Sequence, residues 1–407
     1  MLVPSARIAA LLSVLAVLSA CTDRAPAPTG LGIAASRSGV PFAASLVSPA
    51  WQAMAATHVP MPPAMNPLQA GHAYALVGVA QYLAVQQADA AVGSDGRSQF
   101  EAERGAVAGA SAVVLTYLFP GAAGAFEDLV TEQANAGLGQ PHPWFMRGEA
   151  IGREVGAGIV TRAQGDGFGL ALNPAPPIGD GYWTTNTPGL PVAGGQLPGV
   201  TPWFLTSASQ FRPGPPPAFG SDAFNVALTE IHSLSVNRTP VQEGLATSWA
   251  YNTGTITPAG YWLRVGTAAI NARGLSEGEA THVYALVSAA MFDAAIGCWD
   301  AKLTYWLIRP WKADAAITTV AAVGKPNHPS YPSGHSCVSA SAAEVLSTFF
   351  PDMRSQLDAQ VIEAGLSRMY GGIHYRFDIT AGQALGRNVA HLAIAADASG
   401  NSVLTPD

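Results

Sequence analysis

Charged residues are scarce in this chain of 407 residues. Asp, Glu, Lys and Arg together make up 12% of it, and the formal net charge is −7 at pH 7. With only 20 Lys plus Arg and no basic run, the chain offers no surface that would release counterions from a nucleic acid. Hydrophobic residues reach 49%, which is typical of a globular protein. The composition therefore excludes both a nucleic-acid-binding protein and a largely disordered one.

Long apolar runs are also missing after residue 21, where none reaches the length of about 18 residues that spans a bilayer. Before that point, Arg7 precedes an apolar run over residues 8–18, which ends in Leu18-Ser-Ala-Cys21. This pattern resembles a bacterial lipoprotein signal. We therefore expect residues 1–21 to be a signal peptide and the protein to be exported to the periplasm, with a soluble body held at the membrane only by lipid on Cys21. A plain secretory signal or a weak cytosolic amphipathic end is the alternative.

Cysteine is rare, with three residues in the whole chain: Cys21, Cys298 and Cys337. If Cys21 carries lipid, the other two form a pair that an oxidising compartment could join in a disulfide. Two buried free thiols are an equally good interpretation.

Alternating strand patterns are absent, whereas helical periodicity is frequent. It predicts helices over residues 67–90, 98–118, 124–136, 144–163, 222–236, 240–250, 259–271, 278–309, 334–350, 354–370 and 378–396. Residues 22–65 are predicted to form a tether and an irregular lead-in, and residues 164–220 a connection rich in Pro and Gly. We therefore predict an all-α protein with two helical bundles, over residues 66–163 and 221–400.

Two cations, Lys302 and Arg309, stand seven residues apart in the predicted helix 278–309, directly before Pro310. Two helical turns would place them on the same face. Two cations on one helix face are more often a solvated surface than a binding site, so this pair alone indicates little.

The segment His328-Pro-Ser-Tyr-Pro-Ser-Gly-His335 leads directly into a predicted helix. Ser333 is a typical N-cap residue, and Gly334 allows the backbone to approach a ligand closely. The free N–H groups at the start of a helix favour an anion. An ordinary turn followed by a helix cap is nevertheless the more common explanation of such a segment.

A third group contains Ser367, Arg368, His374 and Asp378. His374 and Asp378 are four residues apart and are expected to share a helical face. An aspartate placed in this way fixes the tautomer of the imidazole and leaves its other nitrogen free as a nucleophile or metal ligand. A single His–Asp pair is more often structural than catalytic.

The three groups occur together, in order and with matching spacing. Their pattern, Lys-x6-Arg-Pro, Pro-Ser-Gly-His and Ser-Arg-x5-His-x3-Asp, resembles the superfamily of type 2 phosphatidic acid phosphatases, bacterial acid phosphatases and vanadium haloperoxidases. The matching residues are Lys302, Arg309, Pro310, Pro332, Ser333, Gly334, His335, Ser367, Arg368, His374 and Asp378. The resemblance implies a haloperoxidase/acid-phosphatase-like fold with its active site in the C-terminal bundle.

The resemblance also implies an oxyanion site for vanadate or phosphate, in which cations neutralise the oxygens and arginines fix the orientation. The residues that would bind the oxyanion are Lys302, Arg309, Ser333, Gly334 and Arg368.

Three further residues would carry the chemistry. His374, supported by Asp378, would bind the central atom axially, and would thus be the metal ligand of vanadium. His335 would stand opposite as acid and base. With phosphate this arrangement is a transition state for attack by His374, and with vanadate it is a resting cofactor.

Residues outside the shared pattern favour a haloperoxidase. Trp299 and His328 resemble residues on the halide side of such enzymes, and crowding by them would suit halide and peroxide better than a phosphomonoester. Residues 205–213, 238–243, 249–252 and 257–262 resemble bacterial haloperoxidase-like sequences, so the resemblance covers roughly residues 65–396. Asn252 is a departure, because some haloperoxidases have near this position an Asp that pairs with the arginine matched by Arg368.

The sequence thus predicts a vanadate-dependent haloperoxidase that oxidises bromide or iodide with hydrogen peroxide and passes the halogen to an organic acceptor. The alternative is an exported acid phosphatase that needs no vanadate and acts through a phosphohistidine at His374. A protein that only binds the anion is a third possibility. The sequence does not indicate an oligomeric state.

Overall fold

The computed structural model describes residues 46–92, 96–136 and 142–405. These residues form thirteen α-helices and three short 3-10 helices. Within them no β-strand occurs, and a single bridge pairs Tyr182 with Leu307. The all-α prediction is therefore confirmed. The predicted signal peptide and Cys21 lie outside the described residues, and the predicted domain boundaries stay a prediction.

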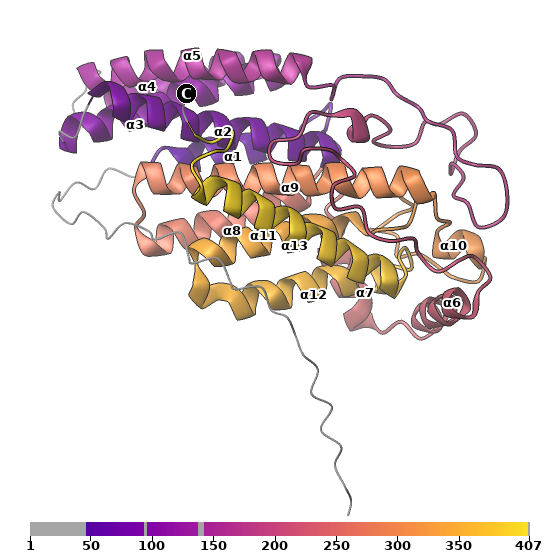
Figure 1. The fold of residues 1–407 in the computed structure, drawn as a ribbon. Coiled ribbons are helices and arrows are strands. Elements are labelled where there is room, and N and C mark those ends of the chain that lie inside the picture. The colour runs from indigo at the N-terminus through magenta and orange to yellow at the C-terminus, as the bar shows by residue number, and fades with distance from the viewer. Residues whose placement is uncertain (1–45, 93–95, 137–141, 406–407) are drawn as a thin grey trace, which may run out of the picture. The chain divides into compact units, whose positions relative to one another are not determined.

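The first five helices precede the Pro- and Gly-rich connection (Figure 1). They are α1 (Ser48–His58), α2 (Pro67–Val92), α3 (Gly96–Leu118), α4 (Ala123–Asn135) and α5 (Pro143–Gly165). Four of them were predicted, but α1 falls within the segment expected to be irregular. Glu277, far away in the chain, accepts the backbone N–H groups of Val47 and Ser48 at 2.8 Å each. A cap supplied from such a distance leaves no signal in the local sequence.

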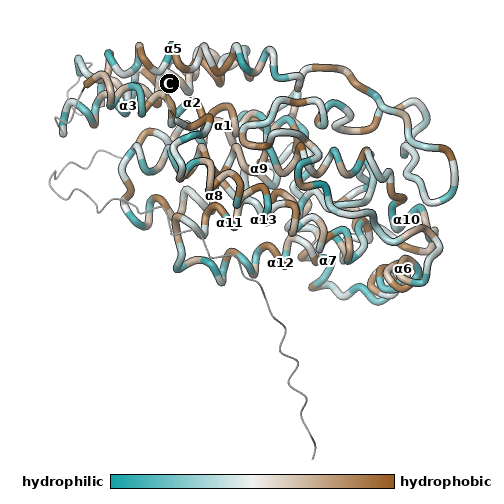
Figure 2. Tube along the Cα trace, viewed as in Figure 1, coloured by the Kyte–Doolittle hydropathy of each residue, from teal (hydrophilic) through white to brown (hydrophobic). Residues whose placement is uncertain are grey.

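The remaining helices follow the connection. They are α6 (Asp222–Val236), α7 (Pro240–Ser248), α8 (Thr257–Arg273), α9 (Glu277–Tyr305), α10 (Pro310–Ala313), α11 (Gly334–Phe349), α12 (Arg354–Tyr370) and α13 (Arg376–Ala398). Figure 2 shows largely apolar colour on the inner helices, whereas α12 is mostly polar.

Helix α9 is the central element of the described chain. It packs against α2 on one side and against α11 and α13 on another. It is also long and apolar enough to cross a membrane by composition, but 94% of its most apolar window is buried within the protein. A helix that is apolar all round and buried in this way is a core helix.

The end of α9 differs from the prediction. The helix ends at Tyr305, and Trp306 adopts a left-handed conformation with φ of 51°. The backbone N–H of Trp183, in the connection, donates to the Trp306 carbonyl at 2.6 Å. Arg309 therefore lies beyond the helix, in extended backbone that caps α10. The prediction that it shares a helix face with Lys302 is wrong, because a contact from a distant segment accompanies the earlier end of the helix.

The connection over residues 164–220 is held against α9 by a buried carboxylate. Asp293 accepts the backbone N–H groups of Trp203, Phe204 and Leu205 at 2.7 to 3.0 Å. Earlier in the connection, the Ala193 N–H donates to the Asn327 carbonyl at 2.9 Å. The connection thus reaches the loop that precedes the Pro-Ser-Gly-His segment.

Candidate active site

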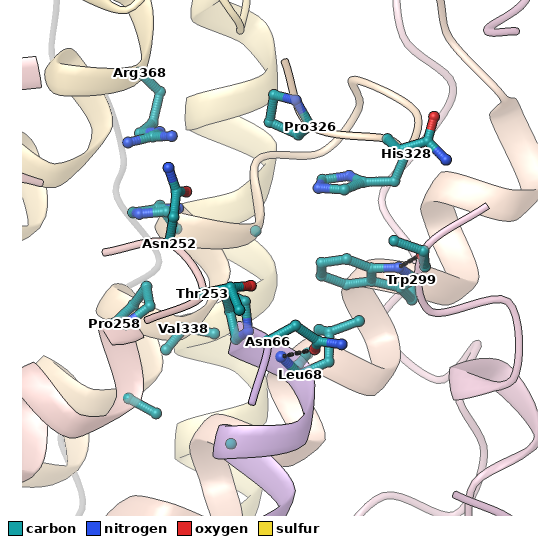
Figure 3. A pocket seen from close by; sticks show the side chains of 18 of the residues that line it. Asn66, Leu68, Asn252, Thr253, Pro258, Trp299, Pro326, His328, Val338 and Arg368 are labelled. Atoms are coloured by element: carbon teal, nitrogen blue, oxygen red, sulfur yellow. Dashed lines mark hydrogen bonds between the residues drawn. The ribbon is translucent and has the colours of Figure 1, made fainter. Parts of the chain in front are cut away.

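Residues of the second and third predicted groups meet at one cavity of about 380 Å³, whereas Lys302 and Arg309 do not line it. Its walls come from the first turns of α2 and α8, the middle of α9, the first turn of α11, and the loop 323–328. The motif residues that line it are Gly334, His335, Arg368 and His374. Figure 3 shows Arg368 and Asn252 on one side of the cavity and Trp299 and His328 on the other. Segments distant in sequence therefore converge on one space.

His374 is fixed through its Nδ1 atom, which lies 2.7 Å from Asp378 Oδ2. The same carboxylate oxygen accepts from Ser330 Oγ at 2.6 Å and from the Tyr375 N–H at 3.2 Å. The predicted contact is present, but not on a shared helical face, because α13 begins at Arg376 and His374 precedes it. With its Nδ1–H donated to Asp378, the imidazole keeps Nε2 as an acceptor.

Arg309 contacts this acceptor from outside the cavity, which it does not line. Its Nη1 donates to His374 Nε2 at 3.0 Å and to the Ile373 carbonyl at 2.7 Å. Its Nε donates to the His328 carbonyl at 2.9 Å, and its Nη2 lies 3.1 Å from His328 Nδ1. Burial and the neighbouring cations, Arg309 first, hold the pKa of His374 well below its usual value. The imidazole is therefore neutral near pH 7.

Lys302 is fully buried and donates from Nζ to three backbone carbonyls. Two of them, those of Pro329 and Ser330, lie at 2.9 Å, and the third belongs to Pro332. Burial lowers the pKa of Lys302 to about 8. In this structure Lys302 ties down the loop before α11 and does not line the cavity.

The roles of Lys302, Arg309 and Ser333 as direct oxyanion ligands therefore stay predictions. Ser333 is the N-cap of α11, as predicted, and its side chain accepts the Ser336 N–H. The first N–H groups of a helix have no partner within that helix, and α11 starts at Gly334 on the cavity wall.

His335 and Arg368 share one acceptor, the carbonyl of Trp249. His335 Nε2 lies 2.9 Å from it, and Arg368 Nη1 lies 3.0 Å from it. Because a carbonyl only accepts, His335 carries its proton on Nε2 and presents Nδ1 as a base. Burial, followed by the charge of Arg368, holds the pKa of His335 well below its usual value. Sequence reasoning missed Trp249 as part of the site, since any residue type supplies a carbonyl.

No carboxylate pairs with Arg368 among the described residues. Asn252 donates to the carbonyls of Ala322 and Val323. Arg368 Nε is buried and has no hydrogen-bond partner. Burial lowers the pKa of Arg368 to about 9, so the side chain stays charged at neutral pH. A buried cation with an unused donor, beside His374 and the start of a helix, fits a bound oxyanion.

Trp299 and His328 face each other, with ring centroids 4.9 Å apart. Trp299 Nε1 also donates to the Ala193 carbonyl at 2.7 Å, which fixes the indole against the connection. Both residues line the cavity, and their role on the halide side stays a prediction. They do not crowd it to the size of a halide ion, because about 380 Å³ remains. Cys298 and Cys337 are buried free thiols.

Residues 280–398 match the family model of the PAP2 superfamily. A search of curated proteins gives no match. Among solved structures, a bacterial vanadium-dependent iodoperoxidase is similar with a TM-score of 0.73 and 23% identity, over 85% of this chain and 95% of that one. A holo-type bacterial vanadium-dependent chloroperoxidase gives 0.63 and 14%, over 84% and 95%. An apo-type one gives 0.62 and 15%, over 81% and 94%.

The family model matches residues 280–398, which contain all the motif residues, and so supports the superfamily predicted from the sequence over this part of the chain. The structural similarity extends the shared fold to most of the chain, including helices before residue 280.

The three carbonyls held by Lys302 lead to a prediction about stability. Lys302→Met removes this donor from all three carbonyls, and those of Pro329 and Pro332 keep only longer contacts, from His328 Nδ1 at 3.3 Å and Cys298 Sγ at 3.8 Å. Each unsatisfied buried group costs roughly 1–3 kcal/mol. We expect the free energy of unfolding to fall by about 3 kcal/mol or more, as measured by urea denaturation. Lys312→Met is the matched control, because Lys312 also donates to carbonyls, of Thr184 and Thr185, but is partly exposed. Equal losses in both variants would contradict the role of Lys302.

The charge of Arg368 leads to a prediction about His335. A nearby cation disfavours the protonated imidazole, so Arg368→Gln should raise the pKa of His335 toward its ordinary value. NMR titration of the imidazole in protein without vanadate measures this shift. Arg354→Gln, at the other end of α12, should leave the pKa unchanged. A pKa that does not rise in Arg368→Gln would show that burial alone governs His335.

Proposed function

We propose that this protein is a vanadate-dependent haloperoxidase that oxidises bromide or iodide with hydrogen peroxide. The observation that carries the proposal is the meeting of His374, His335 and Arg368 at one cavity, with both imidazoles neutral and the guanidinium short of a partner. The similar solved structures are described as vanadium-dependent peroxidases, and their fold extends over helices that the PAP2 match does not include.

Vanadate would be held by Nε2 of His374, in place of the Arg309 N–H that this nitrogen accepts here, by Arg368 and by the N–H groups at the start of α11. Arg309 and Lys302 would add positive charge from behind the wall. When bound, vanadate supplies the activation of peroxide toward attack by a halide ion. The unpaired Arg368 Nε and the fixed tautomer of His374 fit such a group.

The protein's own residues would move the proton and stabilise the charge. His335 Nδ1 is a neutral acceptor and would take a proton from hydrogen peroxide. The buried cations, in surroundings of low polarity, would stabilise negative charge that develops on oxygen. The overall reaction consumes peroxide, halide and one proton, and it releases hypohalous acid and water.

The first test of this function is vanadate binding. His374→Ala should lose most of the affinity, and Asp378→Asn should lower it by roughly 10–100-fold, because residues that orient a metal ligand commonly contribute that much. Isothermal titration calorimetry measures both, and phosphate should compete. His232→Ala is the control, since His232 forms a partly exposed pair with Asp314. Unchanged affinity in His374→Ala would refute the assignment.

The second test is turnover. Vanadate-loaded protein should form triiodide from iodide in a peroxide-dependent reaction, and His335→Ala should lower the rate by roughly 10²–10⁴-fold, as is common for a general acid or base. Bromide should be oxidised and chloride poorly. Hydrolysis of a phosphomonoester by vanadate-free protein, without halide oxidation, would refute the proposal.

That outcome would support the second candidate, an acid phosphatase with His374 as its nucleophile. The size of the cavity favours this candidate, because about 380 Å³ exceeds the space that halide and peroxide need. Export and lipid anchoring at Cys21 belong to either proposal.

A further inference from the structure

One wall of the cavity is apolar and has no part in binding an oxyanion. It is formed by side chains from four helices: Leu68, Pro258, Ala259, Met291, Phe292, Ala295 and Val338. Sites for small organic molecules typically measure about 300–1,000 Å³ and combine apolar walls with a few polar groups. Neither a halide ion nor peroxide gains binding energy from such a wall, because the hydrophobic effect acts on apolar surface. The wall therefore fits an additional, organic compound.

The apolar wall favours an aromatic compound. Met291 and Phe292 lie next to each other on α9, and Trp299 follows two turns later on the same helix. Thioether sulfur and aromatic rings both make favourable contacts with aromatic ligands. Figure 3 shows Leu68, Pro258 and Val338 on the side of the cavity away from Pro326. A flat ring system on this wall would share one cavity with His335 and His374.

The rim of the cavity favours a negative charge on that compound. Among the described residues that line the cavity, none is Asp or Glu, whereas Arg368 and the exposed Lys325 are cationic. The loop that carries Lys325 is anchored, because Asn186 Nδ2 donates to the Lys325 carbonyl at 2.7 Å and Asn327 Nδ2 to the Pro191 carbonyl at 2.8 Å. Since Arg368 would serve the oxyanion, Lys325 is the cation left for the second ligand.

We propose that this cavity binds the organic acceptor of the halogen, and that the acceptor is an electron-rich aromatic compound with one anionic group. The proposal rests on the proposed haloperoxidase function. Hypohalous acid formed from peroxide and halide would react before it leaves the cavity. A ring carbon forms a bond to the halogen, the halogen–oxygen bond breaks, and the carbon loses its proton. That proton and the released hydroxide make water.

Binding is tested without peroxide or halide, so that it does not depend on turnover. The probes are 6-hydroxy-2-naphthoate and its neutral methyl ester, followed by naphthol fluorescence. Lys325→Gln should weaken binding of the carboxylate by up to about fivefold, as expected for one exposed charge, and leave binding of the ester as it was. Ala295→Phe adds a large side chain to the apolar wall and narrows the cavity, so it should weaken binding of both probes by at least about tenfold. Val226→Phe, on an exposed position of α6, is the matched control and should change neither affinity.

Turnover then separates this proposal from the proposed function. Triiodide formation without an acceptor reports halide oxidation alone. With vanadate, peroxide and iodide present, the ratio of iodinated naphthoate to triiodide should fall about tenfold in Ala295→Phe, in line with the weaker binding, and stay constant in Val226→Phe. Lys325→Gln should lower this ratio for the carboxylate only. Because Lys325 is exposed, this variant tests the inference even if Ala295→Phe does not fold.

Three outcomes would overturn the inference. If triiodide forms but the ratio is the same in every variant, the oxidised halogen diffuses out, and the proposed function survives without an acceptor site. If neither probe binds, the apolar wall has no such ligand. If the probes bind as expected but no iodide is oxidised, the proposed function fails, and the acceptor role fails with it.

Discussion

Burial of three cations, of which only two have a carboxylate near enough to raise their pKa, is the constraint on which the rest of the site depends. Lys302, Arg309 and Arg368 are almost completely buried, and Asp378 is the only described carboxylate whose charge raises the pKa of Lys302 or Arg309. No described carboxylate raises the pKa of Arg368, which burial lowers and the charge of Arg309 lowers further. The excess positive charge disfavours protonation of every imidazole nearby. Burial, the larger cause, and this positive charge together keep His374 and His335 neutral, as a ligand and a base need to be.

Backbone carbonyls hold much of this charge in place. Lys302 donates to three of them, Arg309 to two, and Arg368 shares the Trp249 carbonyl with His335. Carbonyl dipoles orient a cation without cancelling its charge. The cations are thus fixed before any anion arrives, and little reorganisation is needed on binding.

Much of the fold and of the site could be predicted from the sequence, because helical periodicity and motif spacing are local signals. Predicted helix ends agree with the structure to within a few residues, except at α9, where the contact between Trp183 and Trp306 ends the helix early. Helix α1 was missed because its cap, Glu277, comes from a distant segment. The Trp249 carbonyl and the apolar wall could not be predicted, since both depend on which segments meet in space.

The choice between the two chemistries depends on how long the anion stays. Vanadate and phosphate are oxyanions of similar shape, so contacts to their oxygens hardly discriminate between them. A hydrolase must release an anionic product in every turnover, whereas a cofactor must remain bound. Asn252, which donates to two backbone carbonyls, leaves Arg368 without a compensating carboxylate. Because Arg368 lacks the compensating carboxylate of some haloperoxidases, we expect it to hold any oxyanion more tightly and to release it more slowly, which supports the proposed resident vanadate over a released product.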